Sequence, residues 1–245
     1  MNEIADNFRN CFAAELRAHQ RSEPVLSRFI EELEAIDCSA YRIVSAKVSP
    51  PTVTNHLETA LDRTGCAQLT ADAVRQLARL VEWYEIFQGE GIDRDLARGL
   101  VAGQVAGPVG IVASSSIRAG LFLLAPDIHY PLHQHAALEI YFVVSGMLIL
   151  QHGRSGTAFH LRPGQWSVTP CHRVHSLTTH GDPCLVIYAW IGEFDAPNWW
   201  WEQVHGGTWR RVRWERQPDA RWLRTAHEPV TEEVLKEAGE EPAEA

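Results

Sequence analysis

The segment that decides the fold is His129–Gly153, with the sequence HYPLHQHAALEIYFVVSGMLILQHG. Its apolar residues are of the kind that form β-strands, yet it also carries four ionisable or polar side chains at odd positions: His133, His135, Glu139 and Tyr141. Residues an even number of positions apart on a strand point to the same face of a sheet. We therefore expect one strand face to hold two imidazoles, a carboxylate and a phenol.

A second segment supplies a further imidazole. About thirty residues downstream the sequence reads Gly164-x5-Pro170-x-His172-x2-His175. Two imidazoles and a carboxylate, joined by an imidazole from another hairpin, form a nitrogen and oxygen ligand set that suits zinc, iron(II), nickel or manganese. A buried carboxylate beside imidazoles also needs a compensating cation. The pattern predicts a metal site, with His175 as the expected fourth ligand and His172 as its rival.

Composition limits the classes of partner. Of 245 residues, 45% are hydrophobic and 22% are charged, which is typical of a globular protein, and the formal net charge is -9. An acidic chain argues against nucleic acid or a polybasic membrane patch as partner, and favours a small molecule or a protein. The five cysteines form no CxxC pair. The N-terminus also lacks a basic start followed by an apolar run. Both features predict a cytoplasmic protein with no membrane span.

The chain divides by pattern into three parts. Apolar residues recur at helical spacing over residues 4–16, 26–36 and 74–87, with Thr70 as an expected cap for the third helix and residues 49–56 as a loop. From about Val109 short β-rich runs alternate with turn signals, which is typical of a sandwich or barrel. The C-terminal part is rich in tryptophan, which we expect to cover the barrel or a subunit interface, and it ends in an acidic tail.

The two histidine-containing segments resemble the paired motifs of the cupins, which are small β-barrels of the double-stranded β-helix (jelly-roll) type. The resemblance implies a mainly β fold with an α-helical N-terminal region. It also implies that His133, His135, Glu139 and His175 bind one divalent transition metal ion. The sequence departs from the cupin pattern at three positions, where Asp127 and His172 replace glycines and Thr179 replaces an asparagine.

A narrower resemblance is to the cupin-type dimethylsulfoniopropionate lyases. It depends on the HxHxxxExY arrangement ending at Tyr141, on the segments ALEIYFVVSG and YAWIGEF, and on a single barrel that follows about a hundred helical residues. It covers the barrel well and the N-terminal half in outline. The implied organisation is a helical region over 1–105, a cupin barrel over 106–195, and a tryptophan-rich extension with an acidic tail over 196–245.

The resemblance implies a metal-dependent lyase that cleaves dimethylsulfoniopropionate to dimethyl sulfide and acrylate by β-elimination. The substrate is a zwitterion whose carboxylate can ligate the metal, and Tyr141, acidified by the cation, is the expected base for the α-proton. Aromatic faces can hold the sulfonium end. The aromatic residues expected near the barrel mouth are Tyr130, Trp166, Tyr188 and Trp190.

Other functions remain open from the residues alone. The same ligands with iron or nickel serve metal dioxygenases among the cupins, and a cupin can also bind a small ligand without catalysis. A sugar-phosphate isomerase is a further alternative, although the basic cluster WRRVRWER lies outside the two motifs. The helical region and the tryptophan-rich tail offer apolar surface that could form a homodimer.

Overall fold

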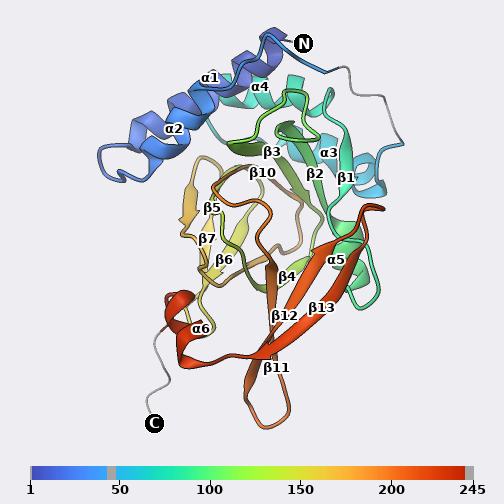
Figure 1. Ribbon diagram of the computed structural model, residues 1–245. Helices are drawn as coiled ribbons and strands as arrows, with labels where there is room; N and C mark the ends of the chain where they lie inside the picture. Colours follow the sequence, from blue (N-terminus) through green and yellow to red (C-terminus); the bar gives the residue numbers. More distant parts are fainter. Residues whose placement is uncertain (1, 43–47, 241–245) are drawn as a thin grey trace.

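Two antiparallel sheets face each other in the computed structural model, which describes residues 2–42 and 48–240 (Figure 1). The six-stranded sheet has the order β1-β2-β3-β10-β5-β8. Its strands are β1 (Trp83–Glu85), β2 (Leu100–Ala106), β3 (Ile117–Leu124), β5 (Leu138–Ser145), β8 (Trp166–Thr169) and β10 (Cys184–Ile191).

The seven-stranded sheet has the order β13-β12-β11-β4-β9-β6-β7. Consecutive strands alternate between the two sheets over much of the barrel, which is the connectivity of a double-stranded β-helix. The strands are β4 (His129–Gln134), β6 (Leu148–His152), β7 (Phe159–Leu161), β9 (His175–Thr178), β11 (Asn198–Gln203), β12 (Trp209–Arg216) and β13 (Trp222–Pro229).

The N-terminal helices cover the outer face of the six-stranded sheet (Figure 1). Their apolar stripes and the outward-facing side chains of the sheet form one hydrophobic core. The helices are α1 (Asn2–His19), α2 (Leu26–Glu34), α3 (Pro51–Asp62) and α4 (Gln68–Ala78), with the shorter α5 (Arg94–Gly99) and α6 (Glu232–Glu237) further along the chain.

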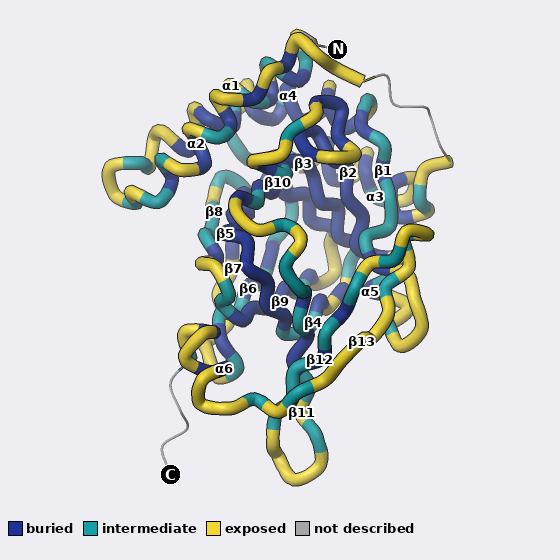
Figure 2. The backbone as a smooth tube through the Cα atoms, in the orientation of Figure 1, coloured by how far each residue is buried: buried dark blue, intermediate teal, exposed yellow. Residues whose placement is uncertain are grey.

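The central strands are buried on both faces, as the dark tube in Figure 2 shows for β5 and β10. On β5, Ile140 and Phe142 pack outward into the helical core, whereas Tyr141 and Val143 pack into the barrel interior. A strand covered on both sides reads as a nearly continuous apolar run. This is why the functional side chains of β5 are embedded in the sequence EIYFVV.

The predicted fold class, mainly β with an N-terminal helical region, is confirmed, and three local predictions are wrong. The helix expected to be capped by Thr70 is α4, which starts at Gln68 after Ala67. Thr70 lies inside this helix, and its hydroxyl donates to Glu15. That helix ends at Ala78, and Tyr84 lies on a strand. The predicted loop at residues 49–56 gives way to α3, because Pro51 is well placed in a helical first turn.

The proposed division at residues 105 and 195 stays a prediction, but the sheets extend across both positions. Strand β1 and most of β2 lie within the part expected to be helical. Strand β11 pairs with β4 and thereby continues the barrel sheet into the C-terminal part. Trp200 and Trp214 from that part are buried in the barrel core, so these tryptophans cover the barrel.

The extreme end of the acidic tail, residues 241–245, which the sequence predicts to be frayed, lies outside the described residues. Among the helices that the structure describes, none has both the length and the apolar character needed to cross a bilayer.

Candidate metal centre

The four predicted ligands come from three strands of two facing sheets. His133 lies on β4 and His135 follows directly after it, and the chain then crosses to the opposite sheet, where Glu139 and Tyr141 lie on β5. The expectation that a single strand face carries His133, His135, Glu139 and Tyr141 is therefore wrong. They converge because β4 and β5 face each other across the barrel interior.

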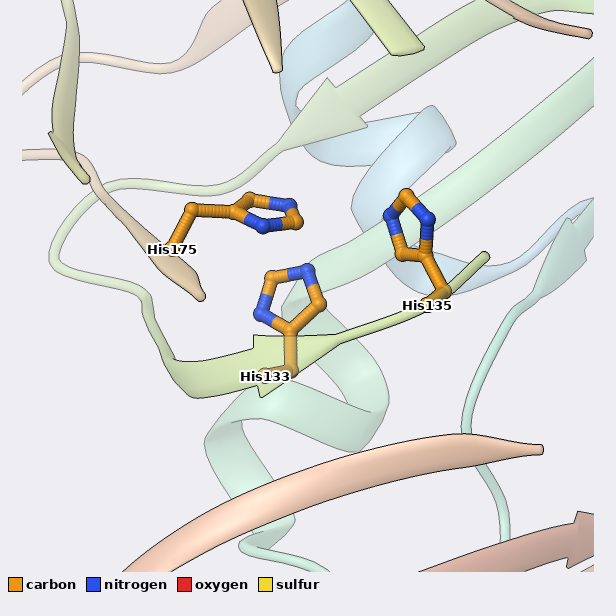
Figure 3. Close-up of side chains that lie close together, drawn as sticks. All are labelled: His133, His135 and His175. Carbon is orange, nitrogen blue, oxygen red and sulfur yellow. The ribbon is translucent and has the colours of Figure 1, made fainter. Parts of the chain in front are cut away.

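The third imidazole comes from β9, whose first residue, His175, pairs in register with His133 on β4. One ring nitrogen from each of His133, His135 and His175 lies within 4.8 Å of the others, and all three residues are buried. Figure 3 shows the three rings turned toward a common space. The structure thus brings together the three histidines that the sequence singled out.

Backbone carbonyls fix the orientation of each ring. The Nδ1 atoms lie 2.8 Å from Pro131 O in His133, 3.1 Å from Ala137 O in His135, and 2.9 Å from Arg173 O in His175. A carbonyl oxygen only accepts, so each Nδ1 must carry the proton. Each Nε2 is then left with a lone pair facing the centre, which is the arrangement found in metal-ligating histidines.

Glu139 is fully buried and its carboxylate reaches the same centre. Its Oε2 atom lies 3.1 Å from His135 Nε2 and 3.2 Å from His175 Nε2. The His175 Nε2 atom is buried and has no hydrogen-bond partner in the part of the chain that the structure describes. Without a proton on Nε2, lone pairs would face a carboxylate oxygen at close range, so these contacts need positive charge, which a bound cation can supply.

The ionisation states of these groups agree with this requirement. Burial, followed by the neighbouring imidazoles, lowers the pKa of His133 well below its usual value, and burial also lowers the pKa of His175. Burial by itself raises the pKa of Glu139, but hydrogen bonds and positive charge from His135 and His175 outweigh it and lower the value, so the carboxylate is ionised when positive charge lies beside it. An ionised carboxylate beside neutral imidazoles is a donor set for a divalent transition metal.

His172, the rival for the fourth position, does not take part. Its backbone has φ of 61°, and its side chain is exposed and lies 3.5 Å from Glu237. Asp127 also has a positive φ, of 59°. These two residues replace the glycines of the cupin pattern, and both keep the left-handed conformation that favours glycine. Both departures from the pattern are therefore compatible with the barrel turns.

Tyr141 follows Glu139 on the inner face of β5 and is buried. Its ring centroid lies 6.5 Å from that of His175 and 6.3 Å from that of Phe122. Burial, followed by the charge of Glu139, raises the pKa of the Tyr141 phenol well above its usual value. In the chain by itself this phenol is therefore neutral.

A cavity of about 640 Å³ opens beside the centre, with His135 and Trp190 in its wall. This size is within the range of small-molecule sites. Sequence patterns miss several of its aromatic residues, because Tyr84 and Phe87 fall within the expected helix over residues 74–87 and Phe122 lies in a β-rich run with no sign of which face is inward. The alternation of inward-facing residues along β3 is the signal that could have identified Phe122.

Two of the predicted aromatic residues line this cavity. Trp190 is in register with Glu139 across β10 and β5, its indole N–H donates to Glu139 Oε1, and its ring stacks on His135 at 4.6 Å between centroids. Tyr188 is in register with Tyr141, and it stacks on Phe122 at 3.9 Å.

The other two predicted aromatic residues lie elsewhere. Tyr130 stacks on His133 at 3.7 Å and supports that ring from the barrel core, outside the lining of the cavity. Trp166 packs against the helical core on the opposite face of the six-stranded sheet, with its ring 5.7 Å from His19. The structure therefore does not bring Trp166 to the cavity.

We expect Trp190→Phe to weaken metal binding by about 10- to 100-fold, the usual effect of losing a hydrogen bond to a ligand. Phenylalanine keeps a ring beside His135 but cannot donate to Glu139 Oε1, so the carboxylate loses its fixed orientation. Competition titration with a chelating dye measures this affinity. Trp214→Phe is the matched control, since its indole nitrogen is buried and has no hydrogen-bond partner within the described chain. Equal affinities of Trp190→Phe and the parent protein would contradict the expectation.

The fold and the site together define a cupin with a candidate metal centre inside the barrel. The family model of the dimethylsulfoniopropionate lyases matches residues 21–186. The chain belongs to this family, and the predictions of family and of enzyme class, a carbon–sulfur lyase, are confirmed.

Individual relatives agree with this assignment. The chain is 25% identical over 197 residues to the dimethylsulfoniopropionate lyase DddQ of Ruegeria pomeroyi, covering 80% of this chain and 94% of the relative. It is 32% identical over 151 residues to DddL of Cereibacter sphaeroides, covering 60% of this chain and 62% of the relative. The full name of DddL is "putative dimethylsulfoniopropionate lyase".

Solved structures confirm the fold. The crystal structure of DddQ from Ruegeria pomeroyi matches with a TM-score of 0.61 at 23% identity, covering 79% of this chain and 95% of that one. A chain from the crystal structures of the lyases RdDddP and RnDddQII matches with a TM-score of 0.58 at 25% identity, covering 78% and 94%.

Proposed function

We propose that this protein cleaves dimethylsulfoniopropionate to dimethyl sulfide and acrylate at the histidine centre. The observation that carries the proposal is the convergence of three imidazole Nε2 atoms and a buried carboxylate beside a cavity of small-molecule size. Membership of the lyase family supports the choice of reaction.

His133, His135, Glu139 and His175 would hold the metal ion, for which zinc, iron(II), manganese and nickel all suit the donor set. A divalent cation bound there would withdraw electrons from the carboxylate of the substrate and favour the ionised form of a nearby phenol. The fixed Nδ1–H contacts keep the three rings in one orientation, so the protein supplies a preorganised site.

Tyr141 is the proposed base. It lies on the same inner strand face as Glu139, and as a phenolate its oxygen would accept the α-proton of the substrate. The electron pair of the C–H bond becomes the second bond of the alkene, and the bond from the β-carbon to sulfur breaks. Dimethyl sulfide leaves with the electron pair of the carbon–sulfur bond, and acrylate remains.

The sulfonium end carries a permanent positive charge and is suited to aromatic faces, at about 0.5 to 2 kcal/mol for each contact. Trp190 and the stacked pair of Tyr188 and Phe122 supply such faces in the cavity wall. Tyr130 contributes indirectly by packing against His133.

The test is an anaerobic incubation of the metal-loaded protein with dimethylsulfoniopropionate. We expect dimethyl sulfide in the headspace and an equal amount of acrylate in solution, both independent of oxygen, because β-elimination involves no change of oxidation state overall. Absence of both products with each of the four candidate metals would refute the proposal. Oxygen consumption with an enediol or catechol substrate would favour a dioxygenase instead.

A further inference from the structure

Arg118 lines the same cavity as His135 and lies outside the group of converging histidines. It is on β3, in register with Trp190 on β10, which is itself in register with Glu139 on β5. Neighbouring strands are about 4.8 Å apart, so the backbones of Arg118 and Glu139 are separated by about 10 Å. Arg118 therefore lies two strands away from Glu139, where it can hold a ligand group without being one of the candidate metal ligands.

Arg118 also lines a second hollow. This outer groove has a volume of about 720 Å³, and its wall includes Ser114 and Ser115 from the loop before β3. The groove and the inner cavity share Arg118 and the loop residues Glu193 to Ala196. Arg118 consequently lies where the outer groove meets the cavity that leads to His135.

The guanidinium of Arg118 is incompletely paired. Its side chain is 27% exposed, and its Nε atom is buried with no hydrogen-bond partner among residues 2–42 and 48–240. The guanidinium carbon lies 4.5 Å from the centre of the Phe194 ring. Its ion-pair partner, Asp195, is 3.9 Å away and fully exposed to solvent, so this pair is weak.

A second cation lies in the wall of the same cavity. The guanidinium of Arg216 lies 5.7 Å from the centre of the Tyr84 ring, and no carboxylate lies within 4.0 Å of it in the described part of the chain. Arg213, also in the wall, pairs with Glu215 at 2.5 Å. The Nε atom of Arg213 also has no partner among the described residues, but its NH2 group is held by Glu215. Arg118 and Arg216 are therefore the guanidiniums of this wall without a close carboxylate, in a chain whose net charge is -9.

We propose that Arg118, assisted by Arg216, forms an entrance site that captures the carboxylate of a small ligand before the ligand reaches the histidine centre. A planar guanidinium with a free N–H fits a carboxylate by paired hydrogen bonds, and partial burial strengthens the contact. The inference that this ligand is the substrate rests on the proposed function. Capture of a carboxylate by itself does not.

The kinetic test compares Arg118→Gln with Arg79→Gln, which makes the same change of charge at an exposed pair with Glu58 on the helical layer. We expect Arg118→Gln to raise KM for dimethylsulfoniopropionate about tenfold with kcat within twofold. We also expect a weaker decrease of kcat/KM with added salt, because steering by charge is screened by ions. An unchanged KM, or a loss confined to kcat, would overturn the proposal.

A binding test is independent of turnover. Calorimetric titration of the metal-loaded full-length protein with propionate, a carboxylate without a sulfonium, should give a Kd at least tenfold higher for Arg118→Gln than for the parent or Arg79→Gln. If propionate binds only at the metal, the three affinities will agree and the entrance site is refuted. If the proposed lyase reaction is wrong, the parent protein will form no dimethyl sulfide, and this result is independent of the propionate titration.

Discussion

Tyr141→Phe is expected to lower kcat by about 100- to 10,000-fold, the range in which a general base contributes, and to leave the metal content unchanged. This corresponds to about 3 to 5 kcal/mol in the activation barrier. The substitution removes only the phenolic oxygen, so the ring can keep its packing beside Phe122 and His175. Burial and Glu139 raise the pKa of this phenol in the chain by itself, so its function as a base depends on the bound cation.

Tyr188→Phe is the matched comparison, since Tyr188 is a buried phenol in register with Tyr141 on the adjacent strand. We expect it to lower kcat/KM less than tenfold, because its role is to present an aromatic face to the cavity. The acrylate formed in quenched reactions gives the rate of each variant, and elemental analysis gives its metal content. If Tyr141→Phe keeps more than about a tenth of the rate, a barrier change below ~1.4 kcal/mol, Tyr141 is not the base.

The choice of candidate ligands could be predicted from the sequence because it depends mainly on residue type. Imidazole and carboxylate groups are rare in apolar, strand-forming segments, and their presence there indicates a compensating cation. The geometric reason was nevertheless wrong. The chain leaves β4 after Gln134 and starts β5 at Leu138 in the opposite sheet, so His135 and Glu139 approach across the barrel, not along one strand.

The cavity could not be predicted because its walls come from distant parts of the chain. Tyr84 lies on a strand of three residues within a segment whose apolar spacing suits a helix, and pairing with β2 overrides that local pattern. Arg118 and Arg216 are about a hundred residues apart in sequence, and only the fold places both in the wall of one cavity. Sequence spacing carries no information about such long-range contacts.

His175→Ala is expected to abolish stable metal binding and, with it, turnover. His175 is fully buried, and its Nε2 atom has no hydrogen-bond partner among the described residues, so its lone pair is available to a cation. Its removal also takes away one of the two imidazoles next to Glu139 Oε2. We expect a purified variant with less than a tenth of the parent's metal by elemental analysis, and no measurable dimethyl sulfide.

Two other histidines provide the controls that separate ligation from a general effect of removing an imidazole. His152 pairs in register with His175 on the neighbouring strand, but its Nε2 lies 3.2 Å from the hydroxyl of Thr169 and it is not part of the converging group. His172 is the rival from the same segment, and its side chain is exposed near Glu237. Because neither residue belongs to the converging group, His152→Ala and His172→Ala should both retain the metal. Full metal content in His175→Ala, or loss of metal in His172→Ala, would transfer the fourth position to another group and remove the basis for a site built on β4, β5 and β9.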